Sequence, residues 1–366
     1  MSEFLSRRFD GMKPYAPGEQ PQGREYVKLN TNESPYPPAP GVIDALGRAA
    51  AERLNLYPDP KARSARAAIA ASLGVRPENV ILGNGSDELL AFCFQAFCDA
   101  GAPAVYHDIA YGFYKVFARA LGAPSRVVPL ESDFGVDVDK LCPAGGTLVL
   151  ANPNAPTGLA LPISAIEAIL RANPRNVVVI DEAYAEFGAE SALPLIAEHG
   201  NLIVMRTMSK SRNLAGARLG YAVASEPLIA DLNRMRFSFN PYNVNALSLL
   251  AAEASVRDEA YFRQCVGSIA KTRRFASDAL QRRGFELTRS LANFLFARPG
   301  FMGGGEYYAR LKEKGVLVRH FADERISGHV RITVGTAEQM QALLDATDEI
   351  IAAGGSAAAG ESIALE

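Results

Sequence analysis

Apolar and polar positions alternate in a regular order through the middle of the chain. Four short apolar runs have the length of buried strands: Val80–Leu82, Ala104–Tyr106, Thr147–Ala151 and Asn176–Ile180. Between them lie longer stretches with apolar residues every three or four positions, which is the spacing of helices that bury one face. Because the strand-like runs are almost continuously apolar, both of their faces must be covered. The pattern therefore predicts a mainly parallel sheet with helices on each side.

A fifth apolar run, Leu202–Met205, is followed by a polar loop that holds one lysine, Lys210. Ser209 precedes this lysine, and Arg218 follows it eight positions later. Partial burial and a neighbouring cation both disfavour the charged ammonium, so the free amine of Lys210 is a candidate for Schiff-base chemistry. Considered alone, the same residues are also typical of an ordinary lysine on a solvated loop.

The two ends of the chain follow other patterns. Residues 1–40 are rich in proline, glycine and asparagine and predict an extended N-terminal arm that packs with a small domain. Residues 41–265 hold the strand and helix alternation of a large domain. Residues 266–353 combine helices with short strand-like runs, which predicts that the small domain is of the α+β type. The composition of residues 354–366 predicts a flexible tail. The predicted fold class is thus α/β, with a large domain around a mainly parallel sheet and a smaller α+β domain.

Composition and charge exclude several classes of protein. The 366 residues carry a formal net charge of −2, so we expect neither nucleic acid nor an anionic membrane as a partner. No apolar run approaches the length of a membrane span, and the N-terminus lacks the apolar core of a signal peptide, which together predict a cytoplasmic protein. The cysteines form no CxxC pair and the histidines form no metal motif, so the sequence predicts no metal site.

Several polar side chains come directly after the carboxyl ends of the predicted strands: Ser86, Tyr111, Asn154, Asp181 and Lys210. Open α/β sheets bind their ligands in the crevice at these ends. We therefore expect these side chains to share one site, although they are far apart in the sequence.

Most of these residues have two interpretations, one as part of a ligand-binding site and one as an ordinary structural residue. The turn GNGSDE places Gly85 and Ser86 where a helix begins, and a helix N-terminus binds phosphate, although an ordinary capping box has the same residues. Asp181 ends a buried strand and needs a cation or hydrogen-bond donors, which a protonated pyridine nitrogen or the start of the next helix can supply. Tyr184 offers a phenol to the same site. Tyr111 suits either stacking on a flat ring or a place in the core.

A Schiff-base lysine, an acid for a ring nitrogen and a phosphate-binding helix terminus together indicate pyridoxal 5'-phosphate (PLP). On these residues the chain resembles the fold-type I, class II aminotransferases, and within them the histidinol-phosphate aminotransferases. The resemblance rests on motifs that follow in the expected order over nearly the whole chain: LNTNESPY, LYPDP, GNGSDELL, AYGFYKV, NPNAPTG, DEAYAEF, RTMSKSRNLAGARLGY and VRITVGT.

The resemblance implies a role for the residues of each motif. Lys210 corresponds to the Schiff-base lysine, Asp181 to the partner of the pyridine nitrogen, and Tyr184 to the hydrogen-bond donor for the ring oxygen O3′. Tyr111 corresponds to the residue that stacks on the ring. The cofactor phosphate would be held by Gly85, Ser86, Ser209, Arg218 and, from the neighbouring subunit of a homodimer, Tyr57.

The sequence departs from this family at one position of the site. The family motif reads NPNNPTG, and the asparagine before PTG contacts O3′, but this chain has Ala155 there. Asn154 is the nearest side-chain amide, so we expect it to take that role. If it points elsewhere, Tyr184 contacts O3′ alone.

The substrate pocket is the part of the site that the resemblance defines least. Arg331 in VRITVG resembles the arginine that binds a substrate carboxylate or phosphate, and a planar guanidinium suits both anions. Arg319 and Tyr36 are further candidates for the same pocket. Arg319 is also explained as a surface arginine on a strand.

The activity implied by the resemblance is transamination of L-histidinol phosphate with 2-oxoglutarate, which yields imidazole acetol phosphate and glutamate in histidine biosynthesis. Lys210 would carry the proton between the substrate Cα and the cofactor. An aromatic amino-acid aminotransferase and a threonine-phosphate decarboxylase remain alternatives on the same scaffold. A DNA-binding regulator with an inactive domain of this type would need a basic surface, which the charge does not support.

Overall fold

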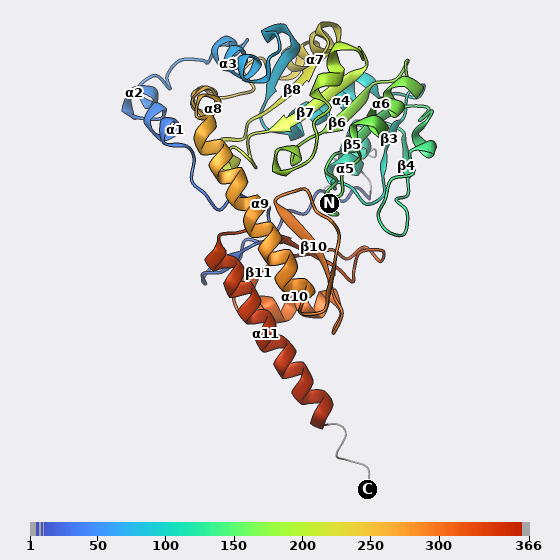
Figure 1. Ribbon diagram of the computed structural model, residues 1–366. Helices are drawn as coiled ribbons and strands as arrows, with labels where there is room; N and C mark the ends of the chain where they lie inside the picture. The colour runs from blue at the N-terminus through green and yellow to red at the C-terminus, as the bar shows by residue number, and fades with distance from the viewer. Residues whose placement is uncertain (1–4, 7–8, 10, 361–366) are drawn as a thin grey trace.

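A computed structural model of the protein describes residues 5–6, 9 and 11–360. Figure 1 shows a larger lobe built around a sheet and a smaller lobe beside it, with the long helix α9 (Glu259–Gln281) running from one to the other. The predicted boundary between the two domains, at residues 265 and 266, falls inside this helix. The two lobes are therefore joined by a continuous helix as well as by packing.

The large lobe is organised around a sheet in the order β2-β8-β7-β6-β5-β3-β4, seven strands among the described residues. These strands are β2 (Val80–Gly83), β3 (Ala104–His107), β4 (Ser125–Val128), β5 (Thr147–Ala151), β6 (Val178–Asp181), β7 (Leu202–Thr207) and β8 (Gly220–Ala224). Neighbouring strands pair in parallel from β4 to β7. Strand β8 is antiparallel to both of its neighbours. The predicted mainly parallel sheet is confirmed, with one reversed strand.

Helices cover both faces of this sheet because successive strand residues point to opposite sides. In β6, Val179 packs with the helices α4 (Ser86–Phe97), α5 (Phe113–Leu121) and α7 (Glu226–Phe239). Its neighbours Val178 and Ile180 instead pack with α6 (Ile163–Ala172). The opposite face also carries α1 (Pro40–Ala45), α3 (Arg63–Leu73) and α8 (Ala246–Arg257), with α2 (Arg48–Ala51) following α1 in the chain.

The small lobe contains an antiparallel sheet in the order β12-β13-β10-β9. Its strands are β9 (Phe285–Leu287), β10 (Phe294–Pro299), β12 (Arg319–His320) and β13 (Val330–Thr333). One core joins this sheet to α9, α10 (Gly304–Glu313) and α11 (Ala337–Gly360). Helix α11 extends to Gly360, into the segment 354–366 predicted to be a flexible tail, whose last residues, 361–366, lie outside the described part.

The N-terminal arm is fastened to the small lobe. Strand β1 (Val27–Lys28) pairs in parallel with β11 (Val316–Leu317), and Leu29 belongs to the core of the small lobe. Short 3₁₀ helices complete the structure: η2 (Pro77–Asn79), η3 (Asp139–Leu141), η4 (Ala185–Phe187), η5 (Leu193–Ala197) and η6 (Ala215–Ala217). No helix in the described ranges combines the length and the apolar character needed to cross a lipid bilayer.

Candidate active site

A cavity of about 680 Å³ lies at the carboxyl ends of the parallel strands, where the arm and both lobes meet. Residues 13–18 and 30–32 of the arm form part of its wall. Most of the residues predicted for the site line it: Ser86, Tyr111, Asp181, Tyr184, Ser209, Lys210, Arg218, Arg319 and Arg331. Parallel strands end at the same edge of the sheet, which explains why residues so far apart in sequence converge.

Lys210 lies in the loop that leaves strand β7, and its amine faces the cavity. Its Nζ donates a hydrogen bond to the backbone carbonyl of Thr31 in the arm, at 3.2 Å, and lies 5.8 Å from the centre of the Tyr184 ring. Burial and, next, the Arg331 guanidinium lower the pKa of Lys210 to about 8. About a tenth of this lysine is therefore the neutral, nucleophilic amine at pH 7, against well under 1% for a free lysine.

This lowered pKa predicts how Lys210 reacts with aldehydes. In the cofactor-free protein, the rate at which the Lys210 amine is modified is expected to rise with pH through about 8, two to three units below a free lysine, whose pKa is near 10.5. Rapid mixing with an aldehyde reagent, followed by reductive trapping and peptide mapping, measures this rate. Lys210→Ala supplies the blank, and an inflection above about 10 would contradict the assignment.

Asp181 ends strand β6 and is nearly inaccessible to solvent. Its Oδ2 accepts a hydrogen bond from the Tyr114 hydroxyl at 2.8 Å, and its Oδ1 accepts one from the Ala183 N–H at 3.1 Å. Burial raises the pKa of Asp181 to about 6, while these two hydrogen bonds act in the opposite direction. At neutral pH most of this carboxylate is ionised, so it can pair with a cation inside the cavity.

Tyr184 presents its hydroxyl to the same space. The hydroxyl accepts a hydrogen bond from the side-chain N–H of Asn32 at 3.1 Å, which leaves its own proton available for an acceptor in the cavity. Burial raises the pKa of Tyr184, so the phenol stays neutral and keeps this proton. Ala155 packs against the Tyr184 ring together with Phe294, so this side of the ring is apolar.

The N-terminus of helix α4 forms a cradle for an anion. No side chain caps this terminus, so its first N–H groups remain free to bind a ligand. Gly85 has a φ of +80°, and a Cβ built on it would lie 2.7 Å from the Arg218 guanidinium. A Cβ on Gly220 would lie 2.4 Å from the backbone nitrogen of Ser86. Both glycines therefore allow the close approach of the α4 terminus to the strand and loop that face it.

Arg218 supplies positive charge to this cradle. It has a left-handed backbone, with φ of +51°, and lies within hydrogen-bond distance of Ser209 Oγ at 3.4 Å and Asp87 Oδ2 at 3.2 Å. The other oxygen of Asp87 accepts a hydrogen bond from the Tyr111 hydroxyl at 2.8 Å. Arg218 and the free N–H groups of α4 thus face one position, with the Tyr111 ring beside it. This donor set fits a phosphate attached to a flat ring.

Two arginines of the small lobe, Arg319 and Arg331, also line the cavity. Arg331 donates one hydrogen bond, from Nη2 to the Asn30 carbonyl at 3.2 Å, and its buried Nε has no protein partner. Arg319 donates from both terminal nitrogens to the carbonyls of Pro17 and Ala16, each at 2.9 Å. Arg331 therefore keeps donors for a bound anion, while Arg319 also fastens the arm over the cavity.

Four of the predicted site residues are not on the cavity wall. Gly85 is the N-cap residue of α4. Asn154 is buried, and its Nδ2 donates to the Ile109 carbonyl and the Thr157 hydroxyl, each at 3.0 Å, so both of its N–H hydrogens are already used. Tyr36 packs on an apolar cluster formed by Phe187, Ile269 and Val334. The structure therefore does not bring the Asn154 amide or the Tyr36 ring to the cavity.

Tyr57 is the fourth of these residues, and it is on the outside of the molecule. Its side chain is 81% exposed, and its ring stacks on that of Tyr242 with 4.6 Å between ring centres. In its own chain it does not reach the cavity. Its predicted role belongs to the site of a neighbouring subunit, and it stays a prediction.

Sequence reasoning missed several residues that complete the site. The carbonyl of Thr31 and the amide of Asn32 contact Lys210 and Tyr184, and the Tyr114 hydroxyl contacts Asp181. Asn32 lies in the motif LNTNESPY, and its φ of +53° is a conformation that asparagine tolerates better than most residues. That motif was a signal for these two contacts. Nothing in the sequence pattern marks Tyr114, because it looks like any apolar helix residue.

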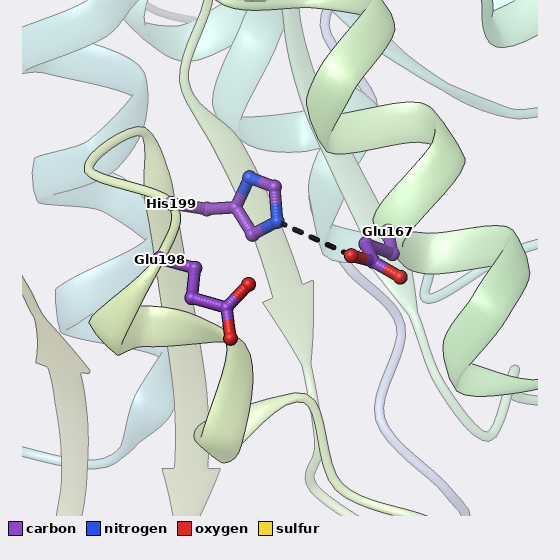
Figure 2. Close-up of side chains that lie close together, drawn as sticks. All are labelled: Glu167, Glu198 and His199. Carbon is purple, nitrogen blue, oxygen red and sulfur yellow. Dashed lines mark ion pairs between the residues drawn. The ribbon is translucent and has the colours of Figure 1, made fainter.

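Away from the cavity, one group of three possible metal ligands occurs among the described residues, Glu167, Glu198 and His199 (Figure 2). Their ligand atoms lie within 4.8 Å of one another, and His199 Nε2 is 4.0 Å from Glu167 Oε1. The same Glu167 oxygen already forms an ion pair with Arg171, one turn along α6. The positive charge of Arg171 opposes a cation here, so we assign the group no ligand.

Comparison with known proteins identifies the family. The model of the family described as "Aminotransferase class I and II" matches residues 24–346 of the chain. The chain belongs to the class I and II aminotransferases. This aminotransferase is 47% identical, over 96% of its length and all of the relative, to histidinol-phosphate aminotransferase 1 of Bradyrhizobium diazoefficiens. It is 44% identical to the histidinol-phosphate aminotransferase of Aromatoleum aromaticum, over 96% of the chain and all of that relative.

A solved structure extends the comparison to the fold. The histidinol-phosphate aminotransferase of Sinorhizobium meliloti, in complex with pyridoxal 5'-phosphate, superposes on this aminotransferase with a TM-score of 0.87. The two chains are 27% identical, and the match covers 96% of this chain and 99% of the other. The predicted enzyme class and the predicted fold-type I architecture are both confirmed.

Proposed function

We propose that this aminotransferase uses PLP to transfer the amino group of L-histidinol phosphate to 2-oxoglutarate. One observation carries the proposal: a buried amine with a lowered pKa, a buried carboxylate and an anion cradle all face one cavity of about 680 Å³. PLP has three complementary groups, an aldehyde, a ring nitrogen and a phosphate. The residues present therefore fit this cofactor.

Each residue has a chemical part in the proposed reaction. Bound PLP supplies an aldehyde for amines and a ring that accepts electrons when a proton leaves the substrate carbon. Lys210 would hold the cofactor covalently and, once its amine is free, would carry the proton as a general base and then as a general acid. Asp181 would pair with the protonated ring nitrogen, and Tyr184 would donate a hydrogen bond to the ring oxygen. The cradle of Gly85, Ser86, Ser209 and Arg218 binds the phosphate.

The charge of the cavity supports an anionic substrate. Six cationic side chains line it against four carboxylates, although the whole chain has a net charge of −2. Arg331, with its unpartnered Nε, is the proposed anchor for the substrate phosphate in one half-reaction and for a 2-oxoglutarate carboxylate in the other. The relatives named above, at 47% and 44% identity, are histidinol-phosphate aminotransferases, which favours that donor.

A spectral titration of the PLP-loaded protein tests the proposal. L-Histidinol phosphate is expected to remove the visible band of the aldehyde cofactor and to raise the near-ultraviolet band of its amine form, with 2-oxoglutarate reversing the change. Phenylalanine and threonine phosphate are run in parallel. Conversion mainly by phenylalanine would assign the protein as an aromatic aminotransferase, and loss of carbon dioxide from a threonine-phosphate reaction would assign a decarboxylase. A protein that binds no PLP would contradict the whole proposal.

The exposed apolar surface supports the proposed homodimer. Tyr57 and Tyr242 stack on each other, and Leu54, Leu56 and Phe239, which are close to them in the sequence, are also exposed. Large exposed apolar side chains grouped in this way are typical of protein interfaces. A second copy of the chain that covers them brings its own Tyr57 toward the partner's phosphate cradle. We further propose that this dimer acts in the cytoplasm.

Tyr57→Phe tests whether the tyrosine crosses the dimer interface. Loss of its hydroxyl is expected to weaken PLP binding about 10- to 150-fold, because a hydrogen bond to a charged phosphate contributes roughly 1.5–3 kcal/mol. Equilibrium dialysis of PLP measures the affinity, and analytical ultracentrifugation checks that the dimer persists. Tyr242→Phe is the matched control, since it removes a hydroxyl from the other ring of the same stacked pair. Equal affinities for all three proteins would count against the role of Tyr57.

A further inference from the structure

Tyr114 contacts the proposed ring-nitrogen partner without touching the cavity. It occupies the second position of helix α5 and is fully buried between that helix and the sheet. Its hydroxyl donates to Asp181 Oδ2 at 2.8 Å, while the other oxygen accepts from the backbone of Ala183. Asp181 lines the cavity and Tyr114 does not. The two donors therefore hold the carboxylate from behind.

The electrostatic surroundings of Asp181 make this donor important. Asp181 interacts electrostatically with titratable groups on three segments of the chain. These groups are Tyr114 on α5, Asp87 and Cys93 on α4, and Glu182 and Tyr184 in the segment after β6. Asp87 and Glu182 are acids, and both raise the pKa of Asp181. Tyr114 and the Ala183 N–H are the groups that favour its ionised form.

A neutral donor suits this position better than a cation. A lysine or arginine in place of Tyr114 would stabilise the ionised carboxylate more strongly, but its charge would compete with a protonated ring nitrogen for Asp181. The hydroxyl of Tyr114 stays neutral, because burial and the Asp181 charge both raise the pKa of the phenol. The carboxylate thus keeps its full negative charge for a ligand in the cavity.

We propose that Tyr114 is a positioning residue that aims the Asp181 carboxylate into the cavity and keeps it ionised for the ring nitrogen of the cofactor. This inference rests on the proposed function, because it needs a cofactor with a basic ring nitrogen. Tyr114 also packs edge-on against Tyr111, with ring centres 5.8 Å apart at an angle of 85°. One buried side chain therefore supports both the proposed nitrogen partner and the proposed stacking residue.

The test compares PLP binding to cofactor-free parent and Tyr114→Phe proteins between pH 5 and 8. The affinity of the parent is expected to fall as the pH drops through about 6, where Asp181 takes up a proton. In Tyr114→Phe this inflection is expected to move up by about one pH unit, since the ionised form loses a charge-assisted hydrogen bond. Below both inflections the variant is expected to bind PLP about tenfold more weakly than the parent, and above both the two proteins are expected to bind it alike.

Tyr106→Phe is the matched control. Tyr106 is a buried tyrosine of strand β3 whose ring lies against Tyr114, with 6.2 Å between ring centres. Removing its hydroxyl perturbs the same apolar cluster without removing the hydrogen bond to Asp181, so its binding profile is expected to match the parent. Circular dichroism melts check that each variant is folded. A profile of Tyr114→Phe that coincides with those of the parent and Tyr106→Phe overturns the inference.

Asp181→Asn separates this inference from the proposed function. In this variant the inflection near pH 6 is expected to disappear, and adding Tyr114→Phe is expected to have no further effect, because the two residues act through one contact. An additive loss in the double variant would overturn the positioning role alone. If Asp181→Asn binds PLP as the parent does at every pH, the assignment of Asp181 in the proposed function fails, and this inference fails with it.

Discussion

Lys210→Ala is expected to lower the rate of amino-group transfer by about 10⁴-fold, since one general acid–base group contributes about 10² to 10⁴ and covalent attachment of PLP is lost as well. The structure gives the reason. The amine of Lys210 faces the cavity, and its pKa is lowered to about 8, so no other described residue there combines a nucleophilic nitrogen with this position. Single-turnover absorbance with L-histidinol phosphate measures the loss.

Lys210→Arg is the control for charge. It restores a cation beside Thr31 but supplies no nucleophile, so it is expected to be as inactive as the alanine variant. Mass spectrometry after borohydride reduction is expected to find PLP attached to the parent and to neither variant. Turnover above about one per cent of the parent in either variant would show that another group moves the proton.

Arg331→Ala is expected to lower kcat/KM for histidinol phosphate by about 10² to 10³-fold, which corresponds to roughly 3–4 kcal/mol for an anion left without its buried partner. Arg331 lies in the cavity wall with a buried Nε that has no protein partner, so its donors are available to the substrate. Arg331→Lys keeps a charge but loses the planar fork, and a loss of about tenfold is expected. Steady-state kinetics at fixed 2-oxoglutarate measures both.

The two half-reactions distinguish substrate binding from a general defect. If Arg331 binds the phosphate of one substrate and the carboxylate of the other, both half-reactions are slowed in stopped-flow measurements, while PLP affinity is unchanged. Arg298→Ala is the control, because Arg298 lies on the neighbouring strand β10 and forms an exposed ion pair with Glu286. A loss confined to one half-reaction would mean that the second anion binds elsewhere, with Arg319 as the first candidate.

The sequence alone predicted those site residues that lie at or just beyond the ends of strands. Asp181 directly follows an apolar run and Lys210 follows one after four residues, and the rule that parallel strands bind ligands at their carboxyl ends placed them together. The same reliance on apolar runs explains why the sequence did not predict the edge strand β4. Three of its four residues, Ser125–Val127, are exposed, so it carries no continuous apolar run to recognise.

The contacts that the sequence did not predict are made between segments that are far apart in the chain. The carbonyl that accepts the Lys210 hydrogen bond is 179 positions away, in the arm, and the hydroxyl that reaches Asp181 is 67 positions away. A backbone carbonyl has no side-chain signature, and a buried tyrosine is indistinguishable from other core residues until its hydroxyl is placed. The direction of Asn154 is likewise fixed in part from afar, by the Ile109 carbonyl 45 positions away as well as by the nearby Thr157 hydroxyl.

Because strand β8 runs antiparallel to β7, the residues between the two strands form a hairpin loop inside the large lobe. The loop between β7 and β8 is closed at its base, where Thr207 pairs with Gly220 and the Met208 N–H bonds to the Leu219 carbonyl at 2.9 Å. Lys210 and Arg218 both belong to this closed loop, so their spacing is set within the large lobe. Arg319 and Arg331 belong to the other lobe. If Arg319 and Arg331 bind the substrate as proposed, mutations there are expected to change the preferred amino donor while leaving the residues proposed to hold the cofactor intact.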